Sequence, residues 1–114
     1  MQLHTITVVN KRVDSVGEYI GRGSPLGNPF TNIPTGTHAK YVVASREEAV
    51  NNYALWLQEQ IHNQQPHILA ELNRLADLAM TQPIKLVCFC APKKCHGDVI
   101  KEVLEKAITE YLQN

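Results

Sequence analysis

Apolar residues recur along the 114-residue chain at two spacings, one typical of strands and one typical of helices. Residues 5–10, TITVVN, are rich in β-branched side chains and predict a first strand. Residues 86–90, LVCFC, are apolar or cysteine throughout, which is typical of a strand buried on both faces of a parallel sheet. Between them, Tyr19 and Ile20 predict a second, very short strand.

Three longer segments carry apolar residues at helical spacing. Residues 45–48, SREE, form a capping box, so the first helix is expected to begin near Arg46. Pro66 is well placed as the first residue of a second helix, and a third is expected to begin near Asp98. This order predicts one α/β domain over residues 1–114, a small Rossmann-like layer structure with a short, mostly parallel sheet and three main helices. Because the sheet is thin, a homodimer would help to cover its edge.

The composition narrows the class of protein. Eleven basic residues balance eleven acidic ones, which argues against a general nucleic-acid or membrane-surface binder. No run approaches the roughly 20 apolar residues of a membrane span, and the first residues carry no signal-peptide pattern. All three cysteines lie within residues 88–95, which fits thiols or a metal site in a reducing cytosol better than a secreted disulfide framework. We therefore expect a cytoplasmic protein.

Two polar loops carry the candidate chemistry. Ligands collect at the carboxyl ends of the strands in an open parallel sheet. Asn10 and Arg12 follow the first strand, and residues 91–98 follow the last, so both segments are expected to open on the same side. Residues 21–30, GRGSPLGNPF, are numerous enough to fold over that edge. We expect the 21–30 and 91–98 loops to form one pocket.

Several groups in these loops suit an anionic, nucleotide-like ligand. Arg22 offers a planar fork for phosphate or carboxylate, and the helix that follows Gly97 offers unpaired N–H groups. Gly21 and Gly23 let the backbone approach a ligand, and Asn28 is expected to orient a base or a sugar. The predicted ligand-binding residues are Asn10, Arg12, Gly21, Arg22, Gly23, Ser24, Asn28, Cys90, Lys94 and Gly97.

Three residues near the start of the last helix are candidate catalysts. The helix N-terminus and the neighbouring lysines are expected to lower the pKa of Cys95, which makes it a candidate nucleophile. His96 is a candidate general acid or base, or a partner for a phosphate or a backbone carbonyl. Asp98 is either catalytic or a helix cap, and the cap is the commoner role of an acid at that position. Glu18 is the only other acid close to the loops.

Zinc is the rival explanation for this cluster, through Cys88, Cys90, Cys95 and His96. The spacing C-x-C-x₄-C-H is poor for a tetrahedral ion, so no metal ligand is predicted. Alternation along a strand places Cys88 and Cys90 on the same face, toward a helix layer. We expect Cys88 to be a core residue and Cys90, at the end of the strand, to lie nearer the site.

Two motifs, and much of the remaining chain, resemble a small family of phage and bacterial proteins known only as a domain of unknown function. The motifs are G-R-x-S-x-x-G-N-P-F at residues 21–30 and C-x-C-A-P-x-x-C-H-G-D at residues 88–98. Leu26 and Phe89 stand where similar proteins usually carry tryptophan, which bears on stacking against a flat ligand. The resemblance implies that the two loops belong together and favours a phage setting. If the chain is phage-encoded, it is expected to act in the host cytoplasm.

The sequence thus predicts a protein that binds a nucleotide or another phosphorylated small molecule and, if it is an enzyme, hydrolyses it or transfers part of it. Neither loop holds an unambiguous catalytic carboxylate, so alternatives stay open. One is a non-catalytic module that sequesters a ligand or binds a host protein in phage counter-defence, and the other is a structural zinc-binding interaction domain. No particular cofactor is indicated, and the expected partner is an anionic small molecule rather than nucleic acid.

Overall fold

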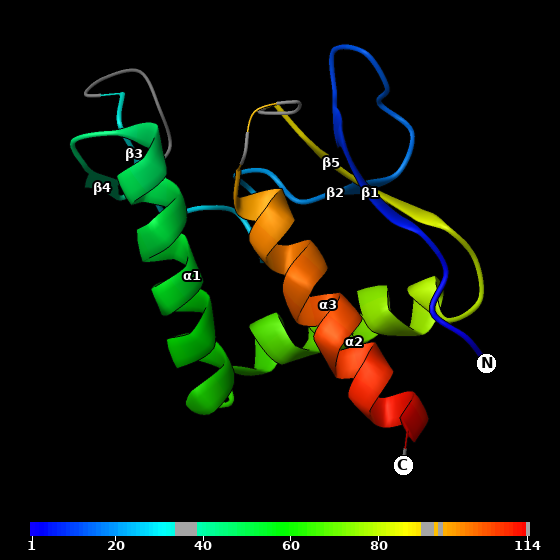
Figure 1. The fold of residues 1–114 in the computed structure, drawn as a ribbon. Coiled ribbons are helices and arrows are strands. Elements are labelled where there is room, and N and C mark those ends of the chain that lie inside the picture. The colour runs from blue at the N-terminus through cyan, green and yellow to red at the C-terminus, as the bar shows by residue number, and fades with distance from the viewer. Residues whose placement is uncertain (34–38, 90–92, 94, 114) are drawn as a thin grey trace.

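The computed structural model describes residues 1–33, 39–89, 93 and 95–113, and Figure 1 shows their arrangement. The elements in chain order are β1 (Ile6–Asn10), β2 (Glu18–Tyr19), β3 (Phe30–Thr31), β4 (Tyr41–Val42), α1 (Arg46–His62), α2 (Pro66–Ala79), β5 (Ile84–Cys88) and α3 (His96–Gln113).

The main sheet has three parallel strands in the order β1-β5-β2. Ile6 pairs with Ile84 and Asn10 with Cys88, so β1 and β5 end level with each other. Strands β3 and β4 form a separate two-stranded parallel sheet. The predicted α/β fold with short parallel sheets and three helices is confirmed at this level.

The two faces of the main sheet are covered differently. On one face, Ile6, Leu86 and Cys88 join the hydrophobic core, where α3 packs on β1 and β5, and α1 and α2 pack against α3. On the other face, the segment after β1 contacts β5, because Asp14 pairs with Lys85. There Gly17 has a φ of +146°, and a Cβ on it would lie 2.7 Å from the backbone oxygen of Lys85. Leu86, Val87 and Cys88 are buried, as the sequence predicts. However, β5 ends at Cys88 and Phe89 is 52% exposed, so the predicted two-sided burial does not extend over the whole 86–90 run.

Local signals place the helix starts. The hydroxyl of Ser45 accepts a hydrogen bond from the Glu48 N–H at 3.1 Å, and the Glu48 carboxylate accepts one from Ala44 at 3.2 Å. The capping box is therefore present, with its carboxylate bonded one residue earlier than the standard pattern. Pro66 is the first residue of α2, as predicted. Helix α3 begins at His96, two residues before the predicted start.

Among the residues that the structure describes, no helix is long and apolar enough to span a membrane.

Candidate functional site

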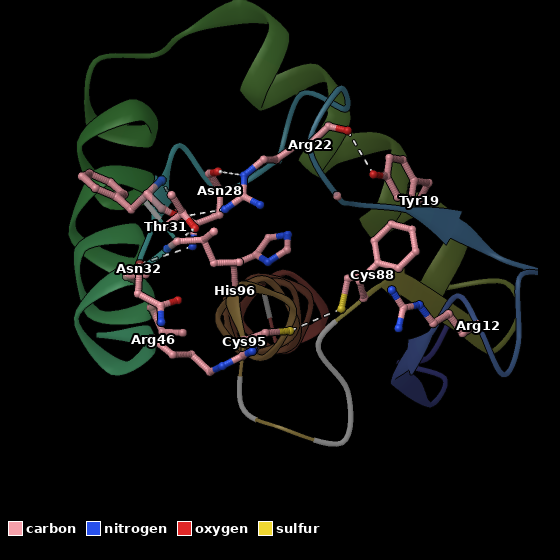
Figure 2. Close-up of a pocket in the computed structure, with 16 residues that line it drawn as sticks. Arg12, Tyr19, Arg22, Asn28, Thr31, Asn32, Arg46, Cys88, Cys95 and His96 are labelled. Atoms are coloured by element: carbon pink, nitrogen blue, oxygen red, sulfur yellow. Dashed lines mark hydrogen bonds between the residues drawn. The ribbon is translucent and has the colours of Figure 1, made fainter. Parts of the chain in front are cut away.

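A cavity of about 570 Å³ lies at the carboxyl edge of the main sheet, between the 21–33 segment and the N-terminal turns of α1 and α3. Figure 2 shows its lining residues. They are Arg12, Tyr19, Gly21, Arg22, Asn28, Phe30, Thr31, Asn32, Ile33, Arg46, Ala49, Val50, Cys88, Phe89, Cys95 and His96. Six of the predicted site residues are in this set: Arg12, Gly21, Arg22, Asn28, Cys95 and His96.

The charge of the cavity is one-sided. Arg12, Arg22 and Arg46 line it, and no acidic side chain is found among the described lining residues. Arg46 and His96 are also the first residues of α1 and α3, so two helices begin at the cavity wall. Because helix N-termini carry partial positive charge, they add to the attraction that the arginines exert on an anion.

Arg22 both shapes the cavity and faces it. Its Nε donates to the backbone oxygen of Asn28 at 3.0 Å, and its Nη2 donates to that of Phe30 at 2.9 Å. The 21–30 loop therefore curls around its own arginine. A guanidinium has five N–H donors, so three remain after these two bonds and are available to a ligand.

Asn28 lines the cavity but is tied to the backbone at both ends of its amide. Its Nδ2 donates to the Ala49 oxygen at 3.3 Å, and its Oδ1 accepts from the Phe30 N–H at 2.9 Å. The geometry thus gives Asn28 a role in holding the loop against α1. Its predicted role in orienting a base or a sugar stays a prediction.

Three other predicted ligand-binding residues lie outside the lining of the cavity. Asn10 joins the ends of β1 and β5, because its Nδ2 donates to the Phe89 oxygen at 3.3 Å and its Oδ1 accepts from the Arg12 N–H at 2.9 Å. Ser24 donates to the Gly21 oxygen at 2.6 Å, and Gly23 has a φ of +98° in the same turn. These residues set the shape of the loops that carry the arginines.

The start of α3 is a capping box with a cysteine as the cap. The Cys95 Sγ accepts from the Gly97 N–H at 3.3 Å, and the Asp98 carboxylate accepts from the Cys95 N–H at 2.9 Å. A Cβ on Gly97 would lie 2.8 Å from Cγ1 of Val8, so glycine lets the helix approach the sheet closely. Gly97 and Asp98 therefore serve the helix start, and neither lines the cavity.

His96 is buried, and its Nε2 donates to the backbone oxygen of Ile20 at 2.7 Å. Burial lowers the pKa of His96 below its ordinary value, and the positive charge of Arg22 lowers it further. The ring is therefore neutral at pH 7, with its proton on Nε2 and an acceptor at Nδ1. This is the chemistry of a general base or of a hydrogen-bond acceptor, and not that of a cationic phosphate ligand.

Cys88 and Cys95 meet at the cavity wall, with their sulfur atoms 3.4 Å apart. Cys88 is a buried core residue, as predicted, but it also lines the cavity. The sequence pointed instead to Cys90 as the cysteine nearer the site, and Cys90 and Lys94 lie outside the described residues. Within the described part of the chain, no three His, Cys, Asp or Glu side chains are placed to share a metal ion.

Sequence reasoning missed Arg46 as a cavity residue, and of the aromatic lining it singled out only Phe89 and missed Tyr19 and Phe30. Arg46 had been assigned only as a helix start, although the N-terminus of a helix is itself an anion-binding feature. Tyr19 and Phe89 flank the ammonium group of Lys11, which lies 4.9 Å and 5.6 Å from the two ring centroids. Glu18 pairs with Arg74 at 2.6 Å and is not among the residues that line the cavity.

The comparisons with known proteins identify a family. The family model described as Domain of unknown function (DUF4326) matches residues 5–106. No curated protein and no solved structure matches the chain. The predicted resemblance to a family of unknown function is confirmed by this match.

Proposed function

We propose a function for this chain, which belongs to the DUF4326 family, from the chemistry of its cavity: it binds a nucleotide or another phosphorylated small molecule. The observation that carries this proposal is the set of three arginines, unopposed by any described acidic side chain, around one cavity. A guanidinium group can donate two parallel hydrogen bonds to two oxygens of one phosphate. The two helix N-termini add further donors.

The size and the walls of the cavity support a nucleotide-like ligand rather than a simple inorganic anion. Its volume of about 570 Å³ falls within the range of sites for small organic molecules. Tyr19, Phe30 and Phe89 add aromatic surface to the lining, on which a flat ring can pack. A ligand with a charged end and a flat end would use both kinds of surface.

The proposal also allows hydrolysis of the ligand or transfer of part of it. His96 is the residue proposed to catalyse that reaction. Its Nδ1 can accept a proton from an attacking water, whereas Asp98 is bonded to the helix start. Since no described carboxylate lines the cavity, binding without turnover is the simpler form of the proposal. That form corresponds to a ligand-sequestering protein.

Three broader expectations accompany the proposal: Rossmann-like layering, a phage-encoded origin and action in the host cytoplasm. A site at the carboxyl edge of a parallel sheet supports the first, because layered α/β folds bind nucleotides there. The other two stay predictions from the resemblance of the motifs.

A panel of nucleotides, with the matching nucleosides, tests the proposal. Melting temperature and calorimetric affinity should respond to nucleotides and not to nucleosides, because the arginines recognise the phosphate. Chromatography of the same mixtures detects any product. Equal responses to both classes, or no response to either, would contradict the proposal. Metal analysis of the purified protein decides the zinc alternative, which requires one bound ion per chain.

Arg46→Ala is the most informative variant, because Arg46 is exposed and begins a helix whose cap is made by other residues. We expect its loss to weaken nucleotide binding by about tenfold, the cost of one charge-assisted hydrogen bond. Lys106→Ala removes one positive charge from an exposed position of α3, about 15 Å along the helix from His96. This control should bind like the original protein.

A further inference from the structure

Two thiols touch in the wall of the cavity. Cys88 ends β5 and Cys95 caps α3, and their side chains are 1% and 2% exposed. Figure 2 shows the two sulfur atoms facing each other, at the separation of 3.4 Å. We propose that Cys88 and Cys95 form a redox-active dithiol, which a small peroxide entering through the cavity converts to a disulfide that weakens anion binding.

The two sulfur atoms are close enough to bond after a small movement. A disulfide has a sulfur–sulfur bond of about 2.05 Å, so the two atoms must approach by about 1.4 Å from their present contact. The bond would join the end of the central strand to the first turn of a helix and close a short loop that includes residues 89–94. Because both residues line the cavity, a small molecule there can reach the sulfur atoms although little of either is exposed at the surface.

The surroundings favour Cys95 as the attacking sulfur. Its Sγ accepts the Gly97 N–H at 3.3 Å at a helix N-terminus, and both features stabilise a thiolate. Three arginines line the same cavity as Cys95, and their positive charge favours a thiolate there. A thiolate is the reactive form toward peroxides, so the first oxidation is expected at Cys95.

The reaction balances with hydrogen peroxide as the oxidant. The Cys95 thiolate attacks one peroxide oxygen, the oxygen–oxygen bond breaks, and the departing hydroxide takes a proton to leave as water. The resulting sulfenic acid is attacked by the Cys88 sulfur, which forms the disulfide and releases a second water. Two thiols are oxidised, one peroxide is reduced, and two waters are formed.

The effect on the ligand rests on the proposed function. In the view of Figure 2, Cys95 lies between Cys88 and Arg46. Cys95 and Arg46 both line the cavity, so drawing Cys95 toward Cys88 changes the position of the start of α3 relative to Arg46, and an anion held by both would lose contact with one of them. We expect the oxidised protein to bind a small anion about tenfold more weakly, the equivalent of one charge-assisted hydrogen bond.

Hydrogen peroxide treatment of the full chain tests the dithiol directly. After a quench with an alkylating reagent, intact mass should show the loss of two hydrogens and one alkylated cysteine, and peptide mapping should find Cys88 linked to Cys95. Dithiothreitol should reverse the change. Cys95→Ser should abolish the intramolecular disulfide without loss of the fold, because serine is a good helix cap. Cys90→Ser should leave the disulfide unchanged.

A disulfide that includes Cys90, or over-oxidation of Cys95 without a disulfide, would overturn the proposal. Inorganic pyrophosphate is the probe for the second part, with its affinity measured before and after oxidation. Equal affinity in the two states would overturn the coupling to anion binding, while the mass result would still establish the dithiol. Failure of the reduced protein to bind pyrophosphate or any nucleotide would instead count against the proposed function.

Discussion

His96 donates a hydrogen bond through Nε2 to the backbone oxygen of Ile20, 2.7 Å away, and so links the first turn of α3 to the residue that follows β2. The same ring meets Tyr53 edge to face, with 5.2 Å between the ring centroids. A side chain proposed to contact the ligand is therefore also part of the core. Substitutions at this position should change both stability and binding.

The buried, neutral state of His96 predicts an acid-sensitive fold. The unfolded chain takes up a proton near the ordinary pKa of 6.5, whereas burial holds the pKa lower in the folded protein. The unfolded state thus binds more protons below pH 6.5, and stability falls there. The loss should be at most about 1.4 kcal/mol per pH unit for this one group. Urea unfolding at about pH 7.5 and about pH 5.5 measures it.

His96→Gln separates this group from the others that titrate. Glutamine keeps an N–H donor for the Ile20 oxygen but does not titrate, so the decrease in stability between the two pH values should be smaller. His67→Gln, at an exposed position of α2, is the matched control and should retain the full decrease. An unchanged pH dependence in His96→Gln would show that other groups cause it.

Gly97→Ala should destabilise the protein although alanine favours helices. A Cβ at this position would lie 2.8 Å from Val8 Cγ1 and 3.0 Å from Ile20 Cδ1. Such overpacking costs about 1–3 kcal/mol, more than the roughly 1 kcal/mol that alanine gains over glycine in a helix. Denaturant unfolding measures the balance. A net gain in stability would mean that the start of α3 can move away from the sheet without cost.

Much of the fold followed from local signals in the sequence. The capping box at Ser45 and the proline at Pro66 place two helix starts because both act within one turn of the chain. The β-branched run at residues 5–10 predicts β1, and the apolar run at residues 86–90 predicts β5. The cavity shared by the 21–30 loop and the start of α3 followed from topology, because parallel strands present their carboxyl ends at one edge.

The missed parts of the site depend on how distant elements pack. Cys88 and Cys95 meet only because Gly97 lets α3 approach the sheet, and strand alternation alone carries no information about that approach. Arg46 reaches the cavity only because α1 begins beside the 21–33 segment. The sequence alone does not distinguish an asparagine that binds a ligand from one that joins two strand ends. Asn10 is of the second kind.

Tyr53→Phe should cost stability through a single buried hydrogen bond. The Tyr53 hydroxyl donates to the Leu26 oxygen at 2.7 Å, and Tyr53 is fully buried. Phenylalanine keeps the packing but leaves that carbonyl without its partner, at a cost of about 1–3 kcal/mol. Tyr111→Phe removes a hydroxyl from a ring that is 58% exposed, and it should change the free energy of unfolding little. Equal effects of the two changes would refute the role of the Leu26 contact.

Arg22→Lys should impair both folding and ligand binding, in contrast to Arg46→Ala. Lysine keeps the positive charge but cannot reproduce the planar fork that joins Arg22 to the oxygens of Asn28 and Phe30. We expect a loss of about 1–3 kcal/mol in the free energy of unfolding, together with weaker nucleotide binding. Arg46→Ala should weaken binding alone. Denaturant unfolding and calorimetry on both variants make the comparison, and a stable Arg22→Lys protein with normal affinity would exclude the dual role of Arg22.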